Sequence, residues 1–224
     1  GNVMLDATTE IKNLWKIIST GTSSILELRA LCPSRSKPAK TLHFRAKDYP
    51  SVDACTQAFE VEALKLNADG YNIYIVMNPI RRDFTGLAAT DQDIAYRDLV
   101  LVDIDRAAPA KEPANDSEVE EARKLADVVE EHLNSKGCGN PIRTMSGNGH
   151  HLYYVLSDTP NHNDATRTIA LFLKQLAAEF NNGLVKIDTT VSNASRITKV
   201  VGTIARKGIE TDDRPYRMAR LYEK

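Results

Sequence analysis

The chain has 224 residues, of which 42% are hydrophobic and 26% charged, so it suits a globular protein with one large domain and not a disordered or fibrous one. A net charge of −1 argues against a protein that coats nucleic acid by charge alone. No apolar run approaches the roughly 18 residues that cross a bilayer, and no signal peptide is recognisable, which predicts a cytoplasmic protein without a membrane partner.

The cysteines and the distribution of charge bear on which sites and partners the protein has. Cysteines at positions 32, 55 and 138 lack CxxC spacing, so we expect neither a zinc site nor a disulfide framework. Residues 196–224 hold eight Lys or Arg against four Asp or Glu, a local balance of 8 − 4 = +4. A basic segment of this kind suits a polyanionic partner, while scattered solvated charge is the alternative interpretation.

Hydrophobic periodicity predicts alternating helices and strands. We expect helices at residues 6–19, 52–66, 117–133 and 163–181. The third should begin with a capping box formed by Ser117 and Glu120. We expect strands at residues 24–31, 41–46, 71–77, 99–104, 141–145, 150–156 and 184–187, and weaker ones at 197–204 and 216–222. Residues 81–96 should form a long loop, and the hairpin-like strand pairs predict a mixed-sheet α/β or α+β fold.

Two aspartates follow a buried strand at the centre of the sequence. The run Leu99–Val102 is apolar, and Asp103 and Asp105 come next, separated by Ile104. Because side chains alternate along a strand, the two carboxylates should share one face. Adjacent buried carboxylates repel each other unless a cation neutralises them, and oxygen ligands suit Mg²⁺ or Mn²⁺. This spacing favours a metal site over a simple strand-end cap.

A third aspartate and a glycine-rich turn lie further along the chain. Asp188 also ends an apolar strand, and a third carboxylate would allow two metal ions to bind. Taken alone, an acid at this place is more often the cap of a helix or turn. The turn of residues 146–149 leads from Ser146 to His150 and His151. Glycines let a backbone approach an anion closely, and strand alternation sends the two histidines to opposite faces. A hairpin with surface histidines is the alternative for this segment.

The segment after Asp188 alternates polar and small apolar residues up to Gly208. Its basic side chains Arg196, Lys199 and Lys207 could neutralise a triphosphate, arginine as a fork and lysine as a point charge. Taken one at a time, each of these residues also fits a solvated basic edge strand.

Taken together and in this order, the three segments resemble the archaeo-eukaryotic primase superfamily, in particular its primase-polymerase branch from plasmids, phages and CRISPR-associated loci. Asp103-Ile-Asp105 corresponds to the first motif, Ser146-Gly-Asn-Gly-His-His151 to the second, and Ile187-Asp188 with the basic segment to the third. The resemblance covers about half of the chain directly.

The resemblance implies a DNA primase/polymerase that joins nucleoside triphosphates to a 3′-hydroxyl by two-metal catalysis. Asp103, Asp105 and Asp188 would hold two Mg²⁺ or Mn²⁺ ions, and Ser146, His151, Arg196, Lys199 and Lys207 would bind the nucleotide. The doubled histidine leaves His150 as the alternative to His151. The expected partners are a single-stranded DNA template, a primer strand and dNTP or NTP. Because the cysteines cannot build the zinc module of many primases, primer initiation would depend either on other elements of this chain or on a further domain outside this sequence.

The implied fold is an N-terminal α/β module, residues 1–98, joined to an RRM-like catalytic module, residues 99–224. Two other functions stay open at this point. One is a different DxD metal-dependent transferase, such as a glycosyltransferase that uses nucleotide sugars. The other is a non-catalytic RRM-like domain that binds nucleic acid, although aromatic residues, which would stack on bases, are only 6% of the chain.

Overall fold

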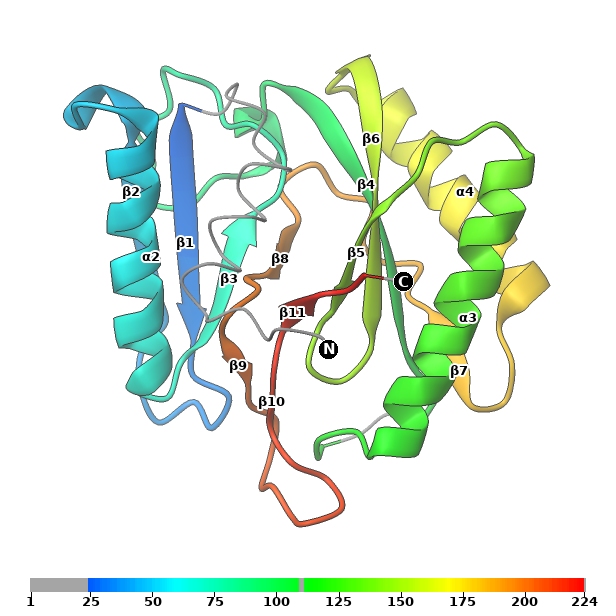
Figure 1. Ribbon diagram of the computed structural model, residues 1–224. Helices are drawn as coiled ribbons and strands as arrows, with labels where there is room; N and C mark the ends of the chain where they lie inside the picture. The colour runs from blue at the N-terminus through cyan, green and yellow to red at the C-terminus, as the bar shows by residue number, and fades with distance from the viewer. Residues whose placement is uncertain (1–23, 109–110, 224) are drawn as a thin grey trace.

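The computed structural model describes residues 24–108 and 111–223 (Figure 1). The helices are α2 (Val52–Ala68), α3 (Asp116–Ser135) and α4 (Asn163–Phe180), with short 3-10 turns η1 (Ala46–Asp48) and η2 (Asp91–Asp93). The strands are β1 (Ile25–Leu31), β2 (Lys40–Arg45), β3 (Asn72–Val76), β4 (Tyr96–Arg106), β5 (Ile142–Met145), β6 (His150–Pro160), β7 (Val185–Ile187), β8 (Ile197–Lys199), β9 (Ile204–Ala205), β10 (Arg217–Met218) and β11 (Arg220–Leu221). The helix expected at residues 6–19 lies outside the described residues.

The first sheet has the strand order β2-β1-β3-β8, with antiparallel neighbours throughout. Helix α2 packs on it, on the left in Figure 1, and is capped by Ser51, whose hydroxyl accepts a hydrogen bond of 3.0 Å from the Ala54 amide. Leu28, Phe59 and Ile73 are fully buried between helix and sheet. Their burial is the main stabilising term of this half of the molecule.

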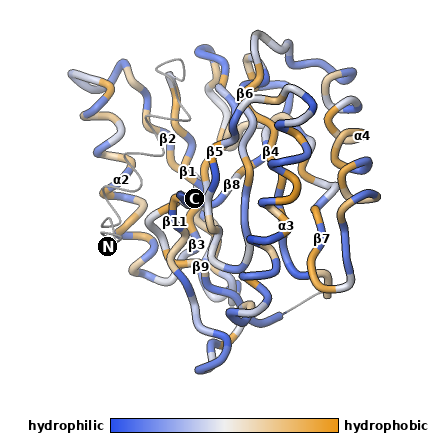
Figure 2. The backbone as a smooth tube through the Cα atoms, turned by 45° about the vertical axis from the view of Figure 1, so that its right-hand side comes forward, coloured by the Kyte–Doolittle hydropathy of each residue, from blue (hydrophilic) through white to orange (hydrophobic). Residues whose placement is uncertain are grey.

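The second sheet has the order β11-β5-β6-β4-β7 and is also antiparallel. Helices α3 and α4 contact it, on the right in Figure 1. Hydrophobic and hydrophilic segments alternate along both helices (Figure 2), as expected for helices with one face in the core. Val102 and Ile104 of β4 are fully buried in this core. Because side chains alternate along a strand, Asp103 between them points to the other face of the sheet.

The mixed α+β fold class is confirmed, and most expected elements are found within a few residues. Three details differ. Strand β4 is longer than expected and begins at Tyr96, inside the expected loop, which also contains η2. The run at 197–204 is divided into β8 and β9 by a turn in which Gly202 has a φ of +84°. The expected run at 216–222 likewise forms two short strands, β10 and β11.

The expected capping box of α3 was wrong by two residues. Asn115 is the N-cap: its Oδ1 accepts from the Glu118 amide at 2.8 Å, and the Glu118 carboxylate accepts from the Asn115 amide at 2.9 Å. The pair satisfies two amides of the first turn, and asparagine is as good an N-cap as serine.

The division of the chain at residues 98 and 99 stays a prediction. Strand β8 bears on it, because it comes from the second half of the sequence and pairs with β3 of the first sheet, with Thr198 opposite Ile75. The described residues from 197 to 199 therefore complete a sheet that is otherwise built from residues 25–76.

Candidate functional site

A cavity of about 1020 Å³ is lined by strands of both sheets. Leu31, Tyr74 and Thr198 line it from the first sheet, and Leu101 and His151 line it from the second. Nearly all of the site residues expected from the sequence line this one cavity: Asp103, Asp105, Ser146, His151, Arg196, Lys199 and Lys207. Asp188 is not among the lining residues.

Asp103 lies opposite His151 in the register of β4 and β6. Its Oδ1 atom is 3.2 Å from Nε2 of His151. Burial alone would raise the pKa of Asp103, but the neighbouring His151, together with the charges of Arg196 and Lys207, holds this pKa below its ordinary value. Asp103 is therefore an ionised acceptor at neutral pH.

Asp105 shares the face of Asp103 because one residue separates them on β4. Burial raises the pKa of Asp105, and the charge of Asp103 raises it further. The Arg106 amide donates to Asp105 Oδ1 at 2.9 Å, which offsets this only in part. Two half-buried carboxylates with mutual repulsion are the donor set that a divalent cation stabilises.

A backbone hydrogen bond places Asp188 beside Asp103. Strand β7 pairs with β4, with Ile187 opposite Ile104, and the Asp188 amide donates to the Asp103 carbonyl oxygen at 2.9 Å. The carboxylate of Asp188 instead accepts from the Thr190 amide at 2.8 Å and from its hydroxyl at 2.7 Å. The residue is thus adjacent to the other two acids, while its carboxylate is held within its own turn.

A metal ion fits part of this arrangement as it stands. Among residues 24–108 and 111–223, no three His, Cys, Asp or Glu side chains already form a metal-binding group. Asp103 and Asp105 offer carboxylate oxygens on one face of β4, which suit a hard cation. To join them, the Asp188 side chain would have to leave Thr190.

The turn between β5 and β6 is fixed by close backbone packing. The Ser146 amide donates to the Gly149 carbonyl at 2.9 Å, and Gly147 has a φ of +105°. A Cβ atom on Gly149 would lie 2.1 Å from the carbonyl oxygen of Ile104. The turn therefore passes directly against β4 between the two aspartates, which explains the need for glycine.

The two histidines point to opposite faces of β6, as strand alternation predicts. His151 lines the cavity. The ring of His150 instead packs edge-on against Tyr222, with 5.1 Å between centroids. Burial, together with the charge of Arg143, lowers the pKa of His150 to about 4, so this imidazole is neutral at physiological pH. His151 is the histidine available to a ligand in the cavity.

The cavity is strongly positive. Of the described residues that line it, two are Asp, and seven are Lys or Arg: Arg35, Lys37, Lys111, Arg196, Lys199, Arg206 and Lys207. The ammonium group of Lys199 lies 4.3 Å from the ring centroid of Tyr74. Burial, and then the charge of Arg206, lowers the pKa of Lys199 to about 7. Such a cavity attracts a polyanion.

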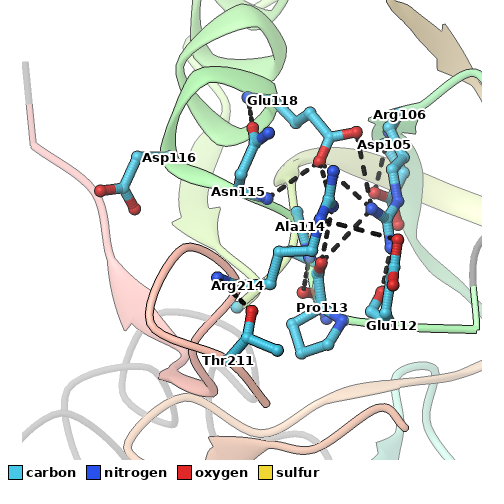
Figure 3. Close-up of polar contacts among 12 residues, drawn as sticks. Asp105, Arg106, Glu112, Pro113, Ala114, Asn115, Asp116, Glu118, Thr211 and Arg214 are labelled. Carbon is cyan, nitrogen blue, oxygen red and sulfur yellow. Dashed lines mark hydrogen bonds and ion pairs between the residues drawn. The ribbon is translucent and has the colours of Figure 1, made fainter. Parts of the chain in front are cut away.

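Glu118 of α3 connects the segment after β4 with the loop between β9 and β10 (Figure 3). Its carboxylate accepts from Arg106 at 3.1 Å and from Arg214 at 2.7 Å. Both guanidinium groups also donate to the Pro113 carbonyl. Arg106 is only 5% exposed, so these contacts hold the chain directly after Asp105 in one place.

Sequence reasoning missed several lining residues. Arg35 and Lys37 belong to the loop between β1 and β2, whose prolines indicated only a loop; the two basic residues between those prolines were the available signal. Thr198, which lines the cavity, was also missed, as was its contact with Tyr153. Both are buried and meet from different sheets, and no local pattern predicts such a contact.

The chain has the fold of the archaeo-eukaryotic primases, mixed α+β with antiparallel sheets. No protein-family model matches the sequence, and no curated protein is significantly similar to it.

The solved structures that share the fold include a cyanophage S-2L primase-polymerase (its AEP domain), with a TM-score of 0.56, 15% identity, and coverage of 96% of this chain and 89% of that one. The catalytic domain of primase RepB′ in complex with initiator DNA has a TM-score of 0.53, 12% identity, and coverage of 98% and 85%. The polymerase domain of Mycobacterium tuberculosis ligase D in complex with DNA has a TM-score of 0.51, 14% identity, and coverage of 90% and 76%. Identities this low establish the fold alone.

The helices can be compared with what crossing a bilayer requires. In the described part of the chain, no helix combines the length and the apolar character that crossing a bilayer requires.

Proposed function

We propose that this protein is a DNA primase/polymerase, a template-dependent nucleotidyltransferase that joins nucleoside triphosphates to a 3′-hydroxyl. The observation that carries the proposal is the meeting of Asp103, Asp105 and His151 with Arg196, Lys199 and Lys207 around one cavity. Carboxylates beside basic residues suit a reaction in which a triphosphate is both bound and cleaved. The shared fold with primase and polymerase domains supports the same assignment.

Asp103, Asp105 and Asp188 are the residues that would hold Mg²⁺ or Mn²⁺. A pair of such ions supplies charge stabilisation to the attacking and leaving oxygens of a phosphoryl transfer. The fit rests on the two carboxylates that share a face of β4 and on the backbone hydrogen bond that keeps Asp188 beside them.

The other residues bind and orient the nucleotide. Ser146 and His151 would contact its phosphates from the side of the second sheet, and Arg196, Lys199 and Lys207 would complete the charge neutralisation. A nucleoside triphosphate carries about four negative charges at neutral pH, so several cations are needed to bind it in place of water. The acids carry too little negative charge to cancel the seven Lys and Arg of the cavity.

The remaining positive charge suits the second polyanion of the reaction, a single-stranded DNA template with its primer. Arg35 and Lys37 lie on the loop between β1 and β2, away from the acids in sequence, and add to the field of the cavity. Contacts with phosphates give affinity without sequence selection, as a template-dependent enzyme requires.

The test is incorporation of labelled nucleotides on a single-stranded DNA template, primed or unprimed, with each dNTP or NTP and with Mg²⁺ or Mn²⁺. We expect Asp103→Asn and Asp188→Asn to incorporate nucleotides at least a hundredfold more slowly than the wild type. Asp212→Asn is the matched control, because Asp212 is exposed and lies outside the cavity. Full activity in folded Asp103→Asn, or transfer from nucleotide sugars in place of nucleoside triphosphates, would refute the proposal.

A further inference from the structure

His151 is linked to the other sheet by two successive hydrogen bonds. Its Nδ1 atom is 3.2 Å from the hydroxyl of Tyr153, and this hydroxyl is 2.5 Å from Oγ1 of Thr198 on β8. Tyr153 is completely buried and Thr198 is 3% exposed. With the Nε2 contact to Asp103, the chain of contacts runs from β4 through β6 to β8.

Simple hydrogen-bond chemistry gives this chain of contacts a direction. The ionised carboxylate of Asp103 can only accept, so Nε2 of His151 must carry a hydrogen. In the neutral imidazole the other nitrogen then accepts, and its donor is the Tyr153 hydroxyl. The Tyr153 oxygen in turn accepts from the Thr198 hydroxyl. His151, Tyr153 and Thr198 each make one donation, and the side-chain nitrogen and oxygen atoms of these three residues all have partners.

The ends of this chain carry residues that the proposed function assigns to the nucleotide. His151 lines the cavity from the second sheet, and Lys199, the neighbour of Thr198, lines it from the first. Both are expected to contact one triphosphate, whose size is fixed. The separation of β6 from β8 and the rotation of the imidazole must then both be set before the ligand arrives.

We propose that Tyr153 is a positioning residue, which fixes the ring orientation of His151 and, through Thr198, its place relative to β8. The part of this proposal that concerns nucleotide binding rests on the proposed function. The hydrogen bond between Tyr153 and His151 does not. Without the tyrosine hydroxyl, Asp103 still selects the Nε2–H tautomer, but Nδ1 loses its donor and the orientation of the ring is less well fixed.

A matched control stands next to Tyr153 on the same strand. Tyr154 is also a buried tyrosine, 8% exposed, but its hydroxyl has no hydrogen-bond partner among the described residues. Tyr154→Phe therefore removes the same atom from the same strand without touching His151. A general loss of packing would affect both variants, whereas loss of positioning would affect only Tyr153→Phe.

The experiment combines ¹⁵N NMR of His151 at about pH 8.5, where a histidine is ordinarily neutral, with steady-state kinetics. We expect the Nε2–H tautomer in all three proteins, and a displaced Nδ1 resonance in Tyr153→Phe but not in Tyr154→Phe, because only Tyr153→Phe removes the hydrogen bond to Nδ1. The KM for the incoming nucleotide should rise about fivefold in Tyr153→Phe with kcat nearly unchanged, as for the loss of one hydrogen bond that supports binding. An unchanged Nδ1 resonance in Tyr153→Phe, or an equal rise of KM in Tyr154→Phe, would overturn the proposal.

The spectroscopic result separates this proposal from the proposed function. If the wild type incorporates no nucleotide, the proposed function fails, while the change in the Nδ1 resonance still decides the role of Tyr153. Should Tyr153→Phe not fold, Thr198→Val takes its place. A rise of KM in Thr198→Val that Thr198→Ser reverses supports the positioning role, and a KM equal to that of the wild type contradicts it.

Discussion

The amide of Asp188 donates a hydrogen bond of 2.9 Å to the carbonyl oxygen of Asp103. Two acids that are far apart in sequence are therefore held on neighbouring strands by the backbone, not by their side chains. Substituting either carboxylate should leave the pairing of β4 with β7 intact. The consequences of removing the charges can then be measured in folded protein.

Substituting Asp103 and substituting Asp105 should change the free energy of unfolding in opposite directions. Asp105→Asn removes a buried charge that Asp103 repels, so we expect it to stabilise the metal-free protein by about 1 kcal/mol at pH 7. Asp103→Asn removes the ionised partner of His151 and should destabilise by about 1 kcal/mol. Urea unfolding without divalent ions measures both. A clear loss of stability in Asp105→Asn would show that the repulsion is already neutralised.

Lys199 should make nucleotide binding depend on pH near neutrality. Its pKa in the folded protein, about 7, means that its positive charge is lost as the pH rises through this value. The Kd of a fluorescent nucleoside triphosphate should therefore increase from about pH 6 to about pH 8. Lys199→Arg keeps the charge at all these values, so its Kd should change less. An equally steep change in Lys199→Arg would assign the effect to another group.

Lys199 should also make the stability of the protein rise with pH. Its folded-state pKa, about 7, lies below the ordinary value of 10.5, so between these values the unfolded chain binds more protons than the folded one. Stability should then rise with pH across this range, and the cost of burying the charge is complete below pH 7. Lys199→Met should flatten this rise in thermal unfolding measured at several pH values. A rise as steep as that of the wild type would contradict the assignment.

Gly149 should not tolerate a side chain. A Cβ atom there would lie 2.1 Å from the Ile104 carbonyl oxygen, so Gly149→Ala must push the turn away from β4. We expect a loss of about 2–3 kcal/mol in stability and a fall in nucleotide incorporation of tenfold or more. Gly139→Ala is the control, since nothing lies within 4 Å of its added Cβ. Equal stability of the two variants would argue against the close approach.

The acids and the turn could be predicted from the sequence because their signals are local. Asp103 and Asp105 follow a continuous apolar run, and Gly149 lies between two strands of clear pattern. The same locality fixed the expected bounds of the long helices to within a few residues. The α+β fold class followed from the alternation of these elements.

Contacts between distant segments could not be predicted in this way. Thr198 meets Tyr153 only because the three-residue strand β8 pairs with β3 of the other sheet, and a strand so short carries little periodic signal. The capping box of α3 was misplaced because Ser117 and Glu120 also fit the local pattern. Contacts of Glu118 with Arg106 and Arg214, which are distant in sequence, accompany the observed box.

Glu118 should contribute more to stability than other acids of α3. Glu118→Gln leaves the buried guanidinium of Arg106 without its anionic partner, and it weakens the contact with Arg214, so we expect a loss of about 2 kcal/mol in the free energy of unfolding. Glu131→Gln, on the exposed side of the same helix, should change it by less than about 0.5 kcal/mol. Urea unfolding compares the two, and equal values would remove Glu118 from its structural role.

The most direct measurement is a crystal structure of the protein with Mn²⁺ and a non-hydrolysable nucleoside triphosphate, with the metal located by anomalous scattering. The proposed function predicts two peaks about 4 Å apart, bound by the carboxylates of Asp103, Asp105 and Asp188, with the Asp188 side chain released from Thr190. The triphosphate should then contact His151 and Arg196. Peaks away from these acids, or a nucleotide bound outside the cavity, would contradict it.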